Sequence, residues 1–476
     1  MLFSSNIFIF IFLPTVIAVY YLIPRRFRAA RNIFLCIASL FFYAWGEPRF
    51  VLVLMLSICV NWLFGLLVDK YRAGPYIKGI IALDIFFNLL IIFIFKYLSF
   101  TVQNLNSIFG SHITDPRILL PIGISFFTFQ AISYVIDVYK EKGAAQKNIL
   151  YVALYISFFP QLIAGPIVRY ETIADQINDR KESFDDFSAG VCRFMLGLAK
   201  KVLISNNMAI IADQAFGISG GDPWLGVNMT LPTGMAWLGA VAYTMQIFFD
   251  FSGYSDMAIG LGRMFGFHFL ENFNYPYISS SVTEFWRRWH ISLGTWFRDY
   301  VYIPMGGSRC SRGRNVLNLF VVWLLTGIWH GANWTFITWG LMYFVLLVFE
   351  KNTPFDINKS SAIKHIYTMF FVIIGWVIFR AENLGAAVDY ISRMFAFDFN
   401  GDGGITLFYA HEYWAFLLAA VIFSLPVVPA LRKKIAAGRH RTLLQLGGAV
   451  ILLGLFMVSV SYIVKGSYNP FIYFNF

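Results

Sequence analysis

Apolar stretches recur along the whole chain, and polar connections separate each one from the next. The hydrocarbon core of a bilayer is ~30 Å thick, and a helix of roughly 20 apolar residues crosses it. Counting one borderline segment at residues 191–204, the pattern predicts about 11–13 transmembrane or re-entrant helices. The other expected helices lie at residues 6–23, 32–45, 51–68, 77–95, 118–136, 149–168, 230–249, 316–329, 334–349, 365–379, 413–428 and 443–464.

Two central stretches, residues 169–201 and 251–314, are too polar and too aromatic to face lipid. Irregular backbone is tolerated at membrane depth only where protein shields it or where it lines an aqueous cavity. We therefore expect these stretches to interrupt the helical pattern and to surround the functional site.

The composition fits an integral membrane protein. Hydrophobic residues make up 58% of the chain and charged residues 13%, whereas a soluble domain carries about 25% charged residues. The first apolar stretch contains Pro14 and has no basic residue ahead of it, so we expect an uncleaved spanning helix rather than a signal peptide. No stretch has the size of a separate soluble domain, so we expect one multi-pass membrane domain over residues 1–476, with its catalytic core at about 118–350.

The basic residues predict an orientation. The formal net charge is +11, and because these charges flank apolar stretches they suit membrane lipid headgroups, so no nucleic-acid partner is expected. The connections after the first, third and fifth helices carry ten Lys and Arg residues, whereas the connections between them carry Arg49, Lys96 and Arg117. Basic residues accumulate on the cytoplasmic side, so the sequence predicts an extracytoplasmic N-terminus.

Other kinds of site find little support. The four cysteines, Cys36, Cys59, Cys192 and Cys310, lie far apart and form no Cys-x-x-Cys pair, so we expect neither a metal site nor a disulfide framework. The phosphate-loop, His-Glu-x-x-His and Gly-x-Gly-x-x-Gly patterns are absent from the sequence. Zinc and dinucleotide chemistries are therefore not predicted.

The sequence T-E-F-W-R-R-W-H-I-S-L stands in the densest polar and aromatic part of the chain. If it is helical, Trp286 and Arg287 share a face with His290, and Glu284 and Arg288 are spaced for an ion pair. This arrangement predicts an imidazole in an aromatic, basic setting. The alternative is an interfacial histidine beside residues that anchor the helix among headgroups.

A second histidine, His330, interrupts two apolar runs in L-L-T-G-I-W-H-G-A-N-W. An ionisable side chain at membrane depth indicates a functional site, and Gly327 and Gly331 would let backbone or a ligand approach the ring. Histidine suits acid–base catalysis at a hydroxyl because its reference pKa of ~6.5 lets a neutral ring take a proton from the hydroxyl and return it later. The alternative is a structural, hydrogen-bonded buried histidine.

Further polar and aromatic residues are expected to line the same cavity. The short polar side chains could instead form a Ser/His/Asp arrangement with either histidine, but they more often satisfy backbone groups of a kinked helix. The tryptophans could instead be ordinary packing or interfacial residues. The expected lining residues are Trp286, Arg287, Trp289, Trp329, Asn333, Trp334, Asp250, Ser252, Ser255 and Asp256.

At these motifs the chain resembles the membrane-bound O-acyltransferases, in particular their bacterial AlgI, PatA and DltB branch, with AlgI-like polysaccharide O-acetyltransferases the most similar. The resemblance extends over nearly the whole chain. Besides the two histidine blocks, it is carried by M-L-F-S-S-N-I-F-I-F-I-F-L-P at 1–14, L-P-I-G-I-S-F-F-T-F-Q-A-I-S-Y-V-I-D-V-Y at 120–139, P-Q-L-I-A-G-P-I at 160–167, G-W-V-I-F-R-A-E-N at 375–383 and F-I-Y-F-N-F at 471–476.

The resemblance implies an all-α membrane fold in which a ring of helices surrounds a thin central region pierced by a tunnel. It also implies that His330 is the catalytic histidine and that His290 is a second active-site histidine. A cytoplasmic thioester and an outer acceptor would reach the imidazole from opposite ends of the tunnel.

The implied function is O-acetylation of a cell-surface or secreted polysaccharide from the bacterial cytoplasmic (inner) membrane. The acetyl donor would be a substrate, acetyl-CoA or another acyl thioester, and no permanently bound cofactor is expected. Because the chain carries no serine-esterase domain, an extracytoplasmic AlgX-, AlgJ- or PatB-like acetyltransferase or esterase-like protein would complete the transfer.

Three alternatives remain open from the sequence. A DltB-like enzyme would transfer D-alanine to teichoic acid from a carrier protein. A non-enzymatic transporter of a lipid-linked sugar would also need broken helices and intramembrane polar residues. A scaffold that recruits other enzymes would tolerate replacement of both histidines.

Overall fold

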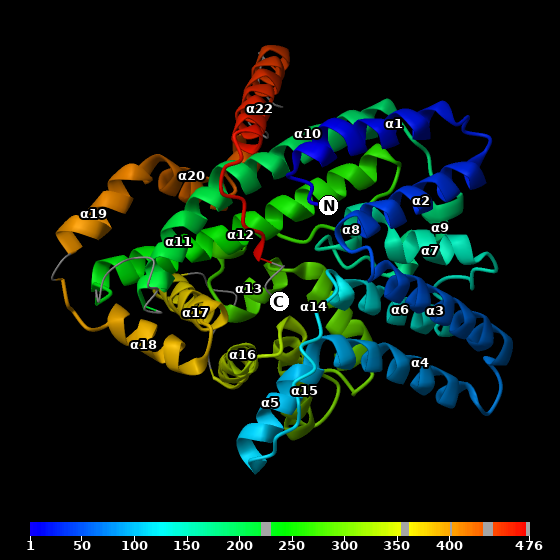
Figure 1. Ribbon diagram of the computed structural model, residues 1–476, viewed down its shortest axis with the longest axis horizontal. Helices are drawn as coiled ribbons and strands as arrows, with labels where there is room; N and C mark the ends of the chain where they lie inside the picture. Colours follow the sequence, from blue (N-terminus) through cyan, green and yellow to red (C-terminus); the bar gives the residue numbers. More distant parts are fainter. Residues whose placement is uncertain (220–229, 354–360, 400–401, 432–440, 473–476) are drawn as a thin grey trace. The chain divides into compact units, whose positions relative to one another are not determined.

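The computed structural model describes residues 1–219, 230–353, 361–399, 402–431 and 441–472, and the regular elements within them are helices (Figure 1). The residues group by their contacts into two compact units. Unit 1 comprises Met1–Phe194 and Ser255–Leu270, and unit 2 comprises Met195–Tyr254 and Glu271–Phe476. The all-helical architecture is confirmed, while the single domain and the tunnel stay predictions.

Unit 1 holds the N-terminal helices, drawn from blue to cyan-green in Figure 1. Helices α3 and α6 contact each other, as do α2 and α7, α4 and α6, and α3 and α4. Their bounds are η1 Phe8–Phe12, α1 Leu13–Leu22, α2 Arg28–Gly46, α3 Val51–Tyr71, α4 Ile77–Ile92, η2 Phe93–Tyr97, α5 Leu98–Phe109, α6 Ile124–Tyr139, α7 Ile149–Ser157, α8 Phe159–Leu162, α9 Tyr170–Asn178 and the first part of α10 Phe184–Ala199.

Unit 2 holds most of the remaining helices, among which α15 packs on α16, α16 on α17, and α13 on both α16 and α17. Their bounds are η3 Lys200–Ser205, α11 Asn206–Ser219, most of α12 Thr233–Met264, η5 Pro276–Ile278, α13 Val282–Arg288, α14 Ile291–Phe297, η6 Arg298–Tyr302, α15 Arg312–His330, α16 Trp334–Asn352, α17 Ala362–Arg380, α18 Leu384–Met394, α19 Asp402–Glu412, α20 Trp414–Ser424 and α22 Arg441–Val464.

Within the described residues, 6 helices are long and apolar enough to cross a membrane, or up to 7 if the bent pair α19 and α20 is one span. The candidate spans are Arg28–Gly46, Val51–Tyr71, Ile77–Phe109, Trp334–Asn352, Ala362–Arg380 and Leu444–Val464. Fewer helices pass than the 11–13 expected, because several expected spans are short. Two shorter apolar helices are Phe8–Leu22 and Ile124–Tyr139.

The helix expected at residues 149–168 is divided in the structure. Helix α7 ends at Ser157, and α8 begins at Phe159 after a non-helical residue at Phe158 (φ −53°, ψ 112°). Pro160 stands in the first turn of α8. Backbone N–H groups in the first turn make no hydrogen bond within the helix, so a proline is tolerated there. A continuous span at this place is therefore wrong, because the apolar run hides a helix boundary.

The expectation that residues 251–314 would interrupt the helical pattern is wrong for its first part, because α12 continues through the D-F-S-G-Y-S-D motif to Met264. Small residues explain how a helix accommodates this segment. A Cβ atom added at Gly253 would lie 2.8 Å from the carbonyl oxygen of Gly197, and one added at Gly260 would lie 2.6 Å from that of Gly190. Glycine on both α10 and α12 thus permits close helix packing, as it does between membrane helices generally.

Candidate active site

The helix expected through residues 284–293 breaks at its histidine. Helix α13 ends at Arg288, α14 begins at Ile291, and His290 between them has left-handed backbone angles (φ 45°, ψ 54°). A non-glycine residue in this region costs roughly 1 kcal/mol, and such strain concentrates at functional sites. The continuous helix is therefore wrong, because the chain leaves the helical conformation at Trp289 and His290.

Helix α13 starts with a well-defined cap. The Ser281 hydroxyl accepts a hydrogen bond from the Glu284 backbone N–H (2.9 Å), and a Glu284 carboxylate oxygen accepts one from the Ser280 backbone N–H (2.9 Å). The ion pair expected between Glu284 and Arg288 is confirmed, with an Nη2–Oε1 distance of 2.9 Å. Arg287 is exposed.

The sequence did not indicate that a glutamate of another helix also caps α13. Glu350, buried in α16, accepts hydrogen bonds from the backbone N–H of Val282 (2.6 Å) and from the N–H (2.8 Å) and hydroxyl (2.6 Å) of Thr283. These are the free N–H groups of the first helical turn, which favour a negative charge. Glu350 therefore fixes the helix that leads to His290.

The hydrogen bonds of Asn272 define the tautomer of His290. The Asn272 side-chain oxygen accepts a hydrogen bond from the Ser292 backbone N–H (3.2 Å), which fixes the orientation of the amide. The same oxygen lies 3.1 Å from His290 Nδ1, so Nδ1 must carry the proton and donate it. His290 Nε2 is then the unprotonated nitrogen, and it has no hydrogen-bond partner among the described residues.

Burial keeps this imidazole neutral. His290 is 3% exposed, and its removal from water lowers its pKa to about 3, because a low-dielectric surrounding disfavours the charged form. At physiological pH, Nε2 is therefore a free hydrogen-bond acceptor.

His330 is the last residue of α15 and is buried, with 6% of its surface exposed. Its ring lies at centroid distances of 4.9 Å from Trp329, 5.0 Å from Trp339 and 5.1 Å from Phe379. Backbone packs closely at the neighbouring glycine, since a Cβ atom at Gly327 would lie 2.6 Å from the carbonyl oxygen of Phe336 on α16. The expected approach of backbone or a ligand to the imidazole ring stays a prediction.

We expect Gly327→Ala to destabilise the α15–α16 pair by about 1–3 kcal/mol, because the added methyl group overpacks a helix contact. Gly313→Ala, on the same helix with nothing within 4 Å of the new Cβ atom, is the matched control and should leave stability unchanged. The measurement is the thermal midpoint of each purified variant in detergent. Equal midpoints for the two variants would show that the close approach is unimportant.

An aromatic cluster joins the two histidines within unit 2. The Trp329 ring lies 6.0 Å from the ring of His290 and 4.9 Å from that of His330. Trp339, which contacts His330, packs 5.4 Å from Trp286. The two histidine motifs, which are 40 residues apart in the sequence, thus converge on one buried region, which spacing alone did not establish.

Several buried polar atoms in this cluster have no hydrogen-bond partner among the described residues. They include His290 Nε2, the indole N–H groups of Trp286 and Trp339, and the hydroxyl of Tyr343. An unsatisfied buried polar group costs about 1–3 kcal/mol, so a native structure with several of them calls for an explanation such as a bound reactant.

The expected lining residues divide between this cluster and other places. Trp286, Trp289 and Trp329 belong to the aromatic cluster, where Trp289 packs 5.6 Å from Phe285. Trp334 is 50% exposed. Asn333 caps α16, since its side-chain oxygen accepts a hydrogen bond from the Thr335 N–H (3.1 Å).

Asp250 and Ser252 lie in α12 within unit 2, and both are buried. Asp250 forms an ion pair with Lys201 (2.7 Å) and accepts a hydrogen bond from the backbone N–H of Ile472 (2.9 Å). Its contacts are thus with η3 and the C-terminal segment. The sequence did not indicate this partner, because Lys201 and Asp250 are far apart along the chain.

Ser255 and Asp256 belong to unit 1, and Asp256 forms an ion pair with Arg193 on α10 (2.9 Å). The D-F-S-G-Y-S-D motif is therefore divided between the units. Its role as a cavity lining stays a prediction.

Comparison with known proteins identifies the chain's family. The model of the family described as MBOAT, membrane-bound O-acyltransferase family, matches residues 144–384. The chain belongs to this family. The matched region includes both histidine motifs, and with the candidate spans it makes the chain a multi-pass membrane protein.

Relatives within this family carry related names. The chain is 42% identical to the "Probable alginate O-acetylase AlgI" of Pseudomonas putida, covering 100% of both chains. It is 34% identical to the "Peptidoglycan O-acetyltransferase" of Helicobacter pylori over 83% of this chain and 80% of the relative. It is 29% identical to the "Teichoic acid D-alanyltransferase" of Bacillus subtilis over 55% and 69% of the respective chains. The resemblance to this branch is confirmed.

We expect Asn272→Ala to lower the rate of acyl transfer about 10- to 100-fold, because it removes the oxygen that orients a reactive imidazole, a typical cost for such a partner. Asn274→Ala, at an exposed position two residues away, is the control. Asn272→Asp keeps the oxygen acceptor and adds a negative charge, so it should retain activity and shift the pH profile to higher pH. An unchanged rate for Asn272→Ala would exclude the positioning role.

Proposed function

We propose that this protein is an O-acetyltransferase that moves an acetyl group from a cytoplasmic thioester, acetyl-CoA, across the inner membrane for O-acetylation of an exported polysaccharide. The observation that carries the proposal is the convergence of His290 and His330 on Trp329 in one buried cluster. Full-length identity to a protein named as an alginate O-acetylase supports the acetyl group and makes alginate-like polymers the first acceptors to test.

His330 is the proposed general base. Its neutral ring takes the proton of the attacking hydroxyl while the hydroxyl oxygen forms a bond to the thioester carbonyl carbon. The carbon–sulfur bond then breaks, and the departing thiolate receives the proton back from the imidazolium of His330. Atoms and charges balance, and no metal or resident cofactor is needed.

His290 is the proposed holder of a reactant. Because Nδ1 donates to Asn272, Nε2 can accept a hydrogen bond from a polar hydrogen of donor or acceptor, such as an amide N–H or a second hydroxyl. The unpartnered indole N–H groups of Trp286 and Trp339 can donate to carbonyl oxygens in the same region. The buried polar atoms would then be satisfied when the reactants bind.

The tryptophans around the histidines have a proposed role as a water barrier. Trp329 and Trp339 contact His330, and both are less than a tenth exposed. A site closed to bulk water limits hydrolysis of a reactive acyl group. This supports the transfer of the acetyl group to a chosen acceptor rather than its loss to water.

The rest of the proposal concerns orientation and assembly. The basic loops of the first five helices support an extracytoplasmic N-terminus, with a tunnel that admits the donor from the cytoplasm. Delivery to the polysaccharide would need an extracytoplasmic partner of the AlgX, AlgJ or PatB type. Whole-chain similarity to AlgI favours this relay over the D-alanyl transfer named for relatives that align with 55% and 61% of the chain.

The test uses the purified full-length protein in liposomes, together with an extracytoplasmic partner of the AlgX, AlgJ or PatB type and acetyl-CoA labelled in the acetyl group. We expect labelled acetyl on an added extracytoplasmic acceptor, release of free coenzyme A, and no transport of a lipid-linked sugar. Transfer of D-alanine from a carrier protein, with no transfer of acetyl, would replace the proposal by the DltB-like function. Movement of a lipid-linked sugar without any acyl transfer would replace it by transport.

A further inference from the structure

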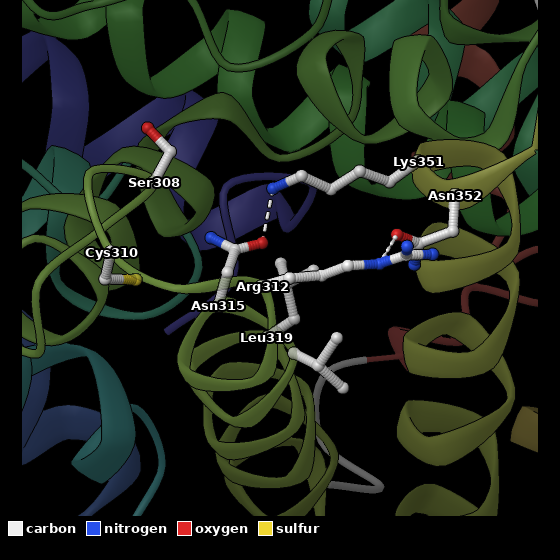
Figure 2. Close-up of a pocket in the computed structure, with 8 residues that line it drawn as sticks. Ser308, Cys310, Arg312, Asn315, Leu319, Lys351 and Asn352 are labelled. Carbon is white, nitrogen blue, oxygen red and sulfur yellow. Dashed lines mark hydrogen bonds between the residues drawn. The ribbon is translucent and has the colours of Figure 1, made fainter.

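A pocket of about 240 Å³ lies between the first turn of α15 and the last turn of α16, within unit 2 (Figure 2). Drug-sized ligands occupy cavities of about 300–1,000 Å³, so this pocket suits one small end of a larger molecule. The lining residues are Ser308, Cys310, Arg312, Asn315, Val316, Leu319, Lys351 and Asn352.

The pocket is rich in positive charge. Figure 2 shows the side chains of Lys351 and Arg312 extending across it from α16 and α15. Their described partners are neutral oxygens: Lys351 donates to the Asn315 side-chain oxygen, and Arg312 donates to that of Asn352 (2.9 Å). Arg309, in the loop before α15, and Arg314, in its first turn, are also exposed. The Arg314 guanidinium donates to the backbone carbonyl oxygen of Met305 (3.4 Å).

The carboxylate nearest in sequence does not neutralise this charge. Glu350 precedes Lys351, but its two oxygens accept the hydrogen bonds from Val282 and Thr283 at the start of α13. The pocket cations are therefore available for an anion. Lys351 and Arg312 keep N–H donors beyond those used on the asparagines.

The remaining lining groups also suit an anion. Ser308 offers a hydroxyl, and the Asn352 amide has one N–H beyond the one that it donates to the Val348 carbonyl oxygen. The first turn of α15 begins here, with Ser311 as its cap, and the free N–H groups of a helix N-terminus add a partial positive charge. Two cations, a hydroxyl and helix N–H groups form a donor set typical of phosphate recognition.

We propose that this pocket binds the phosphate groups at the nucleotide end of a coenzyme A-type acyl donor. The inference rests on the proposed acyl-transfer function, and it names the part of the molecule that anchors the donor. The thioester end of the donor has few groups that distinguish one donor from another. The phosphates at the other end carry the strongest charges of the donor. Anchoring them would hold the donor before its acyl group reaches the histidines.

Helix α15 gives the pocket a fixed distance from the proposed base. The pocket lies at the first turn of this helix and His330 is its last residue. A helix rises 1.5 Å per residue, and the α15 residues that line the pocket, from Arg312 to Leu319, precede His330 by 18 to 11 positions, so they lie roughly 16–27 Å from it along the helix axis. This geometry requires a donor with a long arm between its phosphates and its thioester, as the pantetheine arm of coenzyme A provides.

Two other phosphate-bearing ligands compete with this assignment. An anionic lipid headgroup would be attracted by the same cations, and a phosphopantetheine arm on a carrier protein has one phosphate instead of three. The shared helix with His330 favours a molecule that reaches both places. The three arginines at 309–314 also place the pocket on the cytoplasmic side by the positive-inside tendency, where coenzyme A is available.

The test measures binding to the purified full-length protein in detergent, with free coenzyme A, phosphopantetheine and pantetheine as probes. We expect the wild type to bind coenzyme A about 10- to 100-fold more tightly than pantetheine, since hydrogen bonds to charged groups contribute a factor of this size. In the double variant Arg312→Gln with Lys351→Gln, the ratio of the affinity for coenzyme A to the affinity for pantetheine should fall toward one. Arg312→Lys with Lys351→Arg keeps both charges and should retain most of the preference.

The matched control is Lys465→Gln, which removes one positive charge at an exposed position outside the pocket. It should leave the preference for coenzyme A unchanged. A wild type that binds pantetheine as tightly as coenzyme A would overturn the proposal. So would variants that keep the wild-type ratio but lose binding to phosphatidylglycerol vesicles, because the ligand would then be a headgroup. A stronger preference for phosphopantetheine on a carrier protein would overturn it as well.

The binding readout separates this inference from the proposed function. If no acetyl is transferred but the coenzyme A preference exists and disappears in the paired variant, the function fails and the pocket assignment stands. If acetyl is transferred equally well from acetyl-CoA and acetyl-pantetheine at equal low concentrations, the function stands and the pocket assignment fails.

Discussion

Replacing His330 with alanine should lower the rate of acetyl transfer about 10²- to 10⁴-fold, the usual contribution of a general base. The expected loss is in the chemical step, so kcat should fall while donor binding changes little. The substitution removes a ring packed among Trp329, Trp339 and Phe379. Transfer is measured with labelled acetyl-CoA per amount of folded, membrane-inserted protein.

His411→Ala is the matched control, because this histidine is exposed on α19 and should be replaceable without loss. A folded His330→Ala protein with undiminished specific activity would refute the assignment of the base. Activity lost in proportion to folded protein would mean that the ring only packs. Retained coenzyme A binding with lost transfer would support a role in the chemical step.

The sequence indicated the two histidines because each departs from its surroundings in a visible way. His330 interrupts apolar runs, and His290 follows a dense aromatic and basic segment. Both are buried, and both contact Trp329. Such departures from the hydrophobic pattern are local, so they can be recognised from the sequence alone.

Other features of the site depend on contacts between distant residues. Nothing near His290 predicted its left-handed backbone or its bond to Asn272, because residues 284–293 have good helical spacing on both sides of the break. Glu350 likewise reads as the polar end of a spanning helix, whereas it caps α13. Local pattern gives the helices, and long-range hydrogen bonds decide where they stop.

The same reasoning explains the polar motif of α12. Its aspartates indicated an irregular, cavity-lining segment, because charged groups are costly in a membrane helix. Their partners, Lys201 for Asp250 and Arg193 for Asp256, lie 49 and 63 residues earlier. With those partners in place, the helix can continue, so hydropathy alone could not separate a lining from a buried ion pair.

Glu182 has a comparable structural role in unit 1. It precedes α10 and is 5% exposed. One of its carboxylate oxygens lies 2.5 Å from Nη1 of Arg28 and 3.0 Å from Nη1 of Arg31. The same oxygen accepts a hydrogen bond from the Tyr20 hydroxyl at 2.5 Å. This carboxylate therefore links the loop before α10 to α1 and α2.

The charge balance around Glu182 determines its titration. Burial by itself raises the pKa of Glu182, but the hydrogen bonds from Arg28 and Tyr20 and the charge of Arg28 outweigh burial and lower the pKa to about 2. In an unfolded chain a glutamate has a pKa of ~4.3. The folded state therefore favours the ionised form, so the stabilisation is complete above pH ~4.3 and is lost as the pH falls toward 2.

Glu182→Gln should accordingly destabilise unit 1 by about 3–5 kcal/mol, because it leaves the buried Arg31 and the partly exposed Arg28 without their counter-charge. For a cooperative unit of this size the thermal midpoint should fall by about 6–20 °C. Glu141→Gln is the control, since it makes the same change in an exposed ion pair with Arg72, where a loss of about 0–1 kcal/mol is expected. Midpoints are measured in detergent from pH 7 down to pH 3. The difference in thermal midpoint between wild type and Glu182→Gln should shrink below pH ~4.3, because the wild-type carboxylate becomes protonated and no longer stabilises the folded state by its charge. A difference in midpoint that stays constant over that range would show that the glutamate stabilises unit 1 by packing and not by charge.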